Sequence, residues 1–173
     1  DALEVRPPLV EYDFDDVILL EGIYDFYSFK MFTKHNLSYF PCVSASSIVN
    51  QIPYMIFLGK RYIAIWDNDD EGRGRLLKAT EIFGDKEAER FMTLDNLNNK
   101  LNTRLEEYFV MTELEIFNNE VNNKPQSFEK TILSLFYLNE KDKMIKKYFP
   151  KTLKNFLNIE KKIIEKLNEQ SLQ

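Results

Sequence analysis

Residues 62–75 read Y-I-A-I-W-D-N-D-D-E-G-R-G-R, and this stretch indicates the fold class of the chain. The apolar run at residues 62–66 has the β-branched and aromatic composition of a short buried strand. Acidic residues follow at once, and Gly72 then begins an amphipathic run with helical spacing. The pattern predicts a strand, an acidic turn and a helix. In an open α/β sheet this order places carboxylates at the carboxyl end of a strand, where such sheets bind ligands.

The sequence on either side of this stretch alternates between strand and helix patterns. Residues 17–20, V-I-L-L, form an apolar run typical of a central parallel strand that is buried on both faces. Further strands are predicted at residues 37–43 and 90–94, and further helices at residues 24–33 and 48–58. This alternation predicts an α/β fold in which a parallel sheet carries helices on both faces.

The composition changes after residue 94, where an Asn-rich polar segment begins. From residue 127 onward the pattern predicts two or three helices, at about residues 128–138, 142–148 and 153–167. We therefore divide the chain into three parts. They are an irregular N-terminus or linker at residues 1–16, an α/β domain at residues 17–112, and a C-terminal helical extension at residues 113–173.

Composition and charge limit the possible partners. The 173 residues are 44% hydrophobic, which is enough for the core of one domain. The net charge of −5 does not favour a nucleic-acid partner, so one would require a local basic patch or metal ions. Cys42 is the single cysteine, so a disulfide within the chain is excluded. With no signal peptide and no membrane-spanning run, we expect a cytoplasmic protein without a membrane partner.

The turn after the strand at residues 62–66 carries four acids within five positions: Asp67, Asp69, Asp70 and Glu71. A hard divalent cation with oxygen ligands would relieve the repulsion among them. A solvated loop whose acids favour the N-terminus of the next helix accounts for the turn equally well. For Asp70 and Glu71 we favour this second role. The turn by itself does not decide between the two readings.

A second acidic segment makes the metal site the better reading. Glu21 ends the strand at residues 17–20, and Asp25 lies in the first turn of the following helix. If this strand neighbours the strand that precedes Asp67, Glu21 emerges at the same sheet edge as Asp67 and Asp69. Asp25 can then reach the same pocket. Carboxylates that converge in this way bind one or two Mg²⁺ ions, and such ions support phosphodiester chemistry.

The motifs L-L-E-G-I-Y-D, which contains Glu21, and I-W-D-N-D-D-E-G-R, which contains Asp67, resemble the Toprim domain of topoisomerases, primases and related nucleases. The resemblance implies a Rossmann-like Toprim sheet in which Glu21, Asp67 and Asp69 are the catalytic acids and Gly72 is the family's glycine. The spacing of Glu21 and Asp25 is most similar to the nucleases of the OLD (overcoming lysogenization defect) family. In that family the Toprim part follows an ABC-type ATPase domain.

This resemblance implies a divalent-metal-dependent DNA endonuclease that nicks or cleaves phosphodiester bonds, with Mg²⁺ or Mn²⁺ as the cofactor. The R-L-E-E-Y-F motif at residues 104–109 resembles a later acidic motif of the same family. The implied metal ligands are Glu21, Asp25, Asp67, Asp69 and Glu106. The chain contains no Walker A sequence, so we expect an ATPase domain to precede it in a longer protein or to be absent.

Three further residues are candidates for substrate contacts. Arg73 and Arg75 either contact a phosphate or pair with the acids beside them. Ser46, in the turn after residue 43, either belongs to a helix cap or contacts a polar substrate.

Two alternative functions stay open. One is a non-catalytic Toprim module that binds a metal or a partner, and the other is a primase-like or topoisomerase-like phosphoryl transferase. The sequence also leaves open a homo-oligomer and the choice between DNA and RNA.

Overall fold

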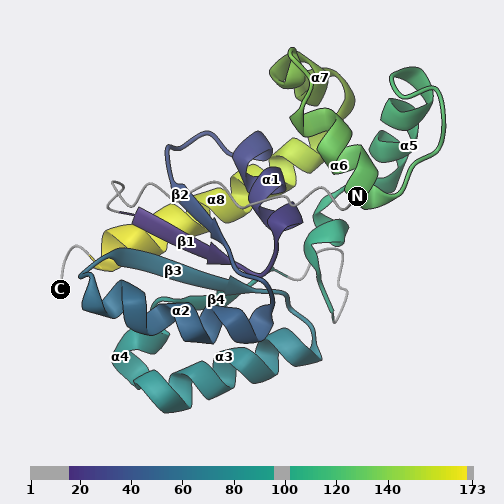
Figure 1. The fold of residues 1–173 in the computed structure, drawn as a ribbon. Helices are drawn as coiled ribbons and strands as arrows, with labels where there is room; N and C mark the ends of the chain where they lie inside the picture. Colours follow the sequence, from purple (N-terminus) through teal and green to yellow (C-terminus); the bar gives the residue numbers. More distant parts are fainter. Residues whose placement is uncertain (1–15, 96–101, 171–173) are drawn as a thin grey trace, which may run out of the picture.

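The computed structural model describes residues 16–95 and 102–170, and Figure 1 shows their arrangement. The predicted N-terminal linker lies outside these residues, apart from Asp16. The strands are β1 (Asp16–Leu20), β2 (Ser38–Pro41), β3 (Arg61–Trp66) and β4 (Phe91–Thr93). The α-helices are α1 (Ile23–Phe32), α2 (Ala45–Phe57), α3 (Asp70–Phe83), α4 (Asp85–Ala88), α5 (Met111–Glu120), α6 (Phe128–Phe136), α7 (Lys141–Tyr148) and α8 (Pro150–Gln170), and a short 3-10 helix, η1, spans Leu105–Tyr108.

The strands form one parallel sheet in the order β2-β1-β3-β4 within the described residues. β1 pairs directly with β3, with Val17 opposite Tyr62 and Leu19 opposite Ala64. The prediction of a parallel α/β sheet is therefore confirmed, and the condition that these two strands are neighbours is met. Their carboxyl ends consequently meet at one edge of the sheet.

Helices cover both faces of the sheet, because the side chains of each central strand alternate between two cores. Val17 and Leu19 of β1 pack with α2 and α3, whereas Ile18 and Leu20 pack with α1 and α8. Figure 1 shows α2 and α3 on one side of the sheet and α1 and α8 on the other. The strands are buried on both sides, which explains why V-I-L-L and Y-I-A-I-W read as continuous apolar runs.

Helix α8 belongs to the predicted helical extension and yet covers the sheet. Its Phe156 is fully buried, and its ring packs against the rings of Phe29, Phe32, Tyr108 and Phe109. Its buried Glu160 accepts hydrogen bonds from the backbone N–H groups of Lys34 and His35, at 2.7 Å each. Residues on both sides of the predicted boundary at residue 112 therefore share one core.

Helices α4 and α5 were not predicted. In α5, Glu113 is buried, and its carboxylate accepts hydrogen bonds from the backbone N–H groups of Lys151 and Thr152, at 2.9 and 3.0 Å. It thereby satisfies free amides in the first turn of α8. Across the described ranges, no helix has the length and apolar character needed to cross a bilayer.

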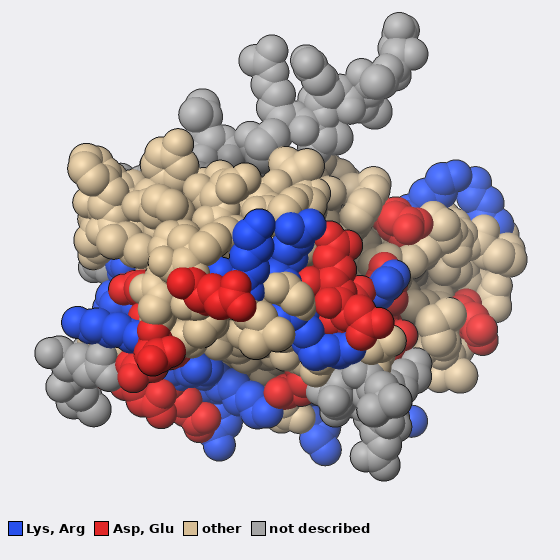
Figure 2. Space-filling view, turned by 90° about the horizontal axis from the view of Figure 1, so that it is seen from below, with Lys and Arg blue, Asp and Glu red and all other residues tan. Residues whose placement is uncertain are grey.

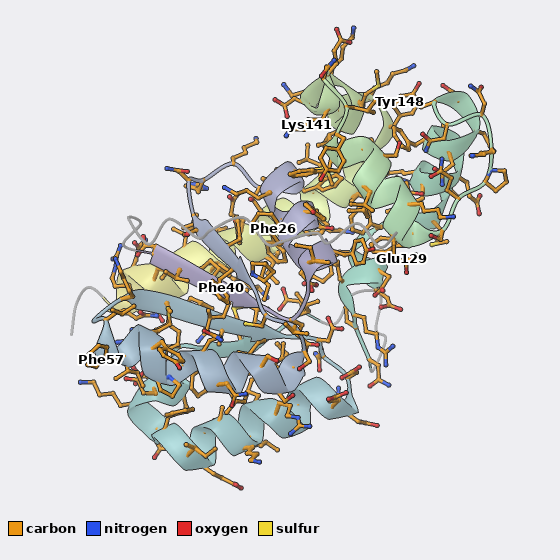
Figure 3. All side chains as sticks on the ribbon, in the orientation of Figure 1. Phe26, Phe40, Phe57, Glu129, Lys141 and Tyr148 are labelled. Atoms are coloured by element: carbon orange, nitrogen blue, oxygen red, sulfur yellow. The ribbon has the colours of Figure 1, made fainter. Side chains whose placement is uncertain are left out.

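The aromatic contacts of α8 predict that Phe156→Ala destabilises the whole sheet domain. Replacing a buried Phe by Ala removes apolar contacts and leaves a cavity, which lowers the free energy of unfolding by about 3–5 kcal/mol. The matched control is Phe57→Ala in α2, where the side chain is 86% exposed and lies at the outer end of the helix in Figure 3. It changes the free energy of unfolding by about 0.5 kcal/mol or less.

Urea denaturation followed by circular dichroism measures both variants. A Phe156→Ala protein that unfolds in two steps, with the sheet retaining its wild-type midpoint, would show that the helical extension is a separate unit.

Candidate functional site

Glu21 and Asp67 lie side by side where β1 and β3 end. The Glu21 carboxylate accepts a hydrogen bond from the backbone N–H of Asp67, at 2.8 Å. Within the sheet, β2 pairs with one edge of β1, whereas β3 pairs with the other edge and β4 lies beyond β3. The strand order therefore reverses between β1 and β3, and open α/β sheets bind ligands at such a switch point.

Asp25 reaches the same place from the first turn of α1. Its carboxylate accepts a hydrogen bond from the backbone N–H of Gly22, at 2.6 Å, and so satisfies a free amide at the start of the helix. The pKa of Asp25 is raised to about 7, chiefly by burial and also by the charges of Glu21 and Glu106, against the hydrogen bond from Gly22. Asp25 is thus within electrostatic range of acids from two other segments.

The pKa of Asp67 is also raised by acids from other segments of the chain. This pKa is raised to about 8, first by burial and then by the charges of Glu21, Asp25, Glu106 and Asp69. Burial also raises the pKa of Glu21, against the hydrogen bond from the Asp67 amide. The structure therefore brings the other four predicted metal ligands within electrostatic range of Asp67. It places Glu106 on the exposed side of the group, in η1.

Asp69 and Gly72 fix the shape of the acidic turn. Asp69 is the N-cap of α3, and its carboxylate accepts a hydrogen bond from the backbone N–H of Gly72, at 2.9 Å. A Cβ atom on Gly72 would lie 2.0 Å from the carbonyl oxygen of Asp67. This position therefore requires glycine because of close packing between the helix and the strand end.

A loop far along the chain closes the site from outside. Asn68 and Thr103 exchange two backbone hydrogen bonds, at 2.7 and 2.9 Å, in an antiparallel bridge. The next residue, Arg104, donates a hydrogen bond from its Nε to the Asp69 carboxylate, at 2.9 Å. The sequence predicted Glu106 of the R-L-E-E-Y-F motif as a ligand but did not predict that Arg104 is part of the site. Its position two residues before Glu106 could have indicated this role.

The three predicted substrate contacts are engaged within the protein. Arg73 donates to the carboxylate of Asp70 at 2.6 Å, and also to Asn68. Arg75 pairs with Glu71 at 3.8 Å. The hydroxyl of Ser46 lies 3.0 Å from that of Ser44, the residue that caps α2. Both arginines thus make the ion pairs that the sequence offered as the alternative to phosphate contacts.

The floor of the site is apolar and fully buried. Trp66, the last residue of β3, packs its ring against Phe91 and donates its indole N–H to the carbonyl oxygen of Ala45, at 2.9 Å. Cys42 lies under the same edge, and burial raises the pKa of its thiol to about 12. The carboxylates are thus backed by protein on one side, which explains why burial dominates their pKa shifts.

The acids converge, but they do not enclose an ion. Within residues 16–95 and 102–170, no three Asp, Glu, His or Cys side chains are arranged to hold a metal together. Glu21, Asp25 and Asp69 instead accept the backbone hydrogen bonds described above. As a donor set, these carboxylate oxygens suit a hard cation such as Mg²⁺ or Mn²⁺. The chemistry of the residues fits the ion, and the side chains would have to turn to bind it.

Comparison of the chain with protein-family models, curated proteins and solved structures found no match. A functional assignment therefore depends on the residues and on their geometry.

The contact at Gly72 predicts opposite effects for two glycines of the same helix. Gly72→Ala forces α3 away from the Asp67 carbonyl and lowers the free energy of unfolding by about 1–3 kcal/mol, as overpacking does elsewhere. The matched control is Gly74→Ala, where a Cβ meets nothing within 4 Å. This substitution raises the free energy of unfolding by about 0.5–1 kcal/mol, because alanine favours a helix interior. Guanidinium denaturation of both variants measures the difference, and equal effects would refute the close packing.

The raised pKa values predict that stability falls as pH rises, in EDTA. Asp67 has an ordinary pKa of 3.8 and a folded pKa of about 8, so the folded state binds the proton more tightly. Its contribution to stability is complete below about pH 4 and is lost by about pH 8. Asp67→Asn removes this titration and raises the free energy of unfolding at the alkaline end by about 1 kcal/mol or more.

Thermal unfolding across this pH range checks the prediction. The control is Asp70→Asn, which makes the same chemical change in a side chain that is 96% exposed. An unchanged pH profile in Asp67→Asn would contradict the raised pKa.

Proposed function

We propose that this chain is a Toprim domain, most similar to the nuclease domain of the OLD family, and that it cleaves DNA phosphodiester bonds with Mg²⁺ or Mn²⁺. The observation that carries the proposal is the hydrogen-bonded contact of Glu21 with Asp67 at the ends of neighbouring strands. The parallel sheet, whose order reverses at this point, supports the same reading. So does the electrostatic coupling of Asp67 with Asp25, Asp69 and Glu106.

Each side chain has a definite part in the proposed reaction. Glu21, Asp67 and Asp69 are the catalytic acids, and Asp25 and Glu106 complete the ligand set. One or two bound ions would supply Lewis-acid activation of the scissile phosphate and of the attacking water. Trp66 and the buried ends of β1 and β3 keep bulk water from the inner side of the carboxylates.

Protons compete with the proposed cation for this site. With a pKa of about 8, the carboxyl of Asp67 is largely protonated at neutral pH when no cation is present. A carboxylate must lose its proton before it can act as a ligand, so cation binding releases protons and strengthens as pH rises. The proposed activity should therefore increase on the alkaline side of neutrality.

The approach of DNA depends on the ions more than on the protein surface. The chain has a net charge of −5. On the described residues of the face in Figure 2, Lys and Arg are interspersed with Asp and Glu and form no continuous basic stripe. Cations held by the carboxylates would offset the repulsion between these acids and the phosphates. An upstream ATPase domain in a longer protein, as in the OLD family, would supply further contacts with DNA.

A non-catalytic binding module is the second candidate, and two observations favour it. The described acidic side chains do not enclose an ion. The C-terminal end of α2 exposes Tyr54 and Phe57, and the next residue, Leu58, is also exposed. Exposed apolar side chains that are close together in this way are typical of contact with a partner. Such a module would keep the fold and lack hydrolysis.

Nicking of supercoiled plasmid separates the two candidates. We expect relaxation of the plasmid that requires Mg²⁺ or Mn²⁺ and stops in EDTA. Glu21→Gln and Asp67→Asn should each lower the rate by about 100-fold or more, because several kcal/mol of charge stabilisation are lost. The control Asp70→Asn, in an exposed side chain, should cleave at close to the wild-type rate. Equal cleavage by wild type and Asp67→Asn would reject the nuclease assignment.

A further inference from the structure

Arg104 provides a positive charge at the acidic site. Its Nε lies 2.9 Å from the carboxylate of Asp69, whose side chain is 14% exposed. Asp69 is the largest cause of the raised pKa of Arg104, and Asp67 and Glu106 add to it. The positive guanidinium thus offsets the negative charges of Asp67, Asp69 and Glu106, as a bound cation would.

The backbone around Arg104 is held independently of this ion pair. The bridge between Asn68 and Thr103 fixes the preceding residue, and the backbone N–H of Arg104 donates to the carboxylate of Glu107, at 2.8 Å. The side chain itself is 63% exposed. The guanidinium can therefore leave Asp69 while the bridge and the backbone hydrogen bond hold the loop in place.

The ion pair and a divalent cation compete for the same carboxylate. One oxygen of Asp69 caps α3 through Gly72, and the other accepts the hydrogen bond from Arg104. A cation ligated by the second oxygen would displace the guanidinium and would then repel it as a like charge.

We propose that Arg104 is the resident counter-ion of the site, and that it must release Asp69 before a divalent cation can bind there. The inference rests on the proposed function, because it concerns the cation that the nuclease would use. It assigns to Arg104 a positioning role that sets the cation affinity, distinct from the ligand role of the acids.

Calorimetric titration with MnCl₂ tests this role without measuring activity. Arg104→Gln keeps the length of the side chain and removes its charge. We expect it to bind Mn²⁺ about tenfold more tightly than wild type, which corresponds to about 1.4 kcal/mol. The matched control is Arg75→Gln, which removes the same charge from the start of α3, where Arg75 pairs with Glu71 and not with Asp69. It should change the Kd by about threefold or less.

Arg104→Lys provides a second variant that keeps the charge, and it should bind Mn²⁺ with nearly wild-type affinity. The melting temperature of each variant in EDTA shows whether its fold is retained. Unchanged or weaker Mn²⁺ binding by Arg104→Gln, with binding by wild type intact, overturns this inference and leaves the proposed function standing. Absence of Mn²⁺ binding in wild type and all the variants at millimolar concentration overturns both.

Discussion

The hydrogen bond from the backbone N–H of Asp67 to the carboxylate of Glu21 joins two strand ends that are far apart in the sequence. It forms because β1 and β3 are direct neighbours in a parallel sheet, so that their last residues reach the same edge. As a result, the carboxylates of Glu21 and Asp67 lie close together beside the buried residue Trp66, and they repel each other when both are ionised. Burial is the main cause of the raised pKa values of Glu21 and Asp67, and the charges of neighbouring acids add to it.

The neighbouring acids raise the free-energy cost of keeping all of these carboxylates ionised at once. Two effects offset this cost. Burial and repulsion favour protons on Asp25 and Asp67, and the guanidinium of Arg104 neutralises Asp69. A divalent cation would replace both the protons and the guanidinium. A nuclease of this kind would therefore respond to pH and to cation concentration through the same side chains.

The sequence predicted the sheet and the convergence of Glu21 with Asp67, because buried parallel strands leave continuous apolar runs and an acid directly follows both β1 and β3. It did not predict α5, whose Glu113 caps α8, and it did not decide whether the C-terminal helix packs on the core or on a partner. An amphipathic pattern shows which face of a helix is buried but not what covers that face. The pairing of Arg104 with Asp69 was also missed, because it depends on the bridge between Asn68 and Thr103, which leaves no local pattern.

We propose that carboxylates from the ends of β1 and β3 form one cation site. Crystals soaked in MnCl₂ and measured near the manganese absorption edge test it most directly. We expect an anomalous difference peak between the carboxylates of Glu21 and Asp67, with oxygen distances of about 2.0–2.3 Å. A protein that shows no peak there, or one only at surface acids elsewhere, would contradict the account.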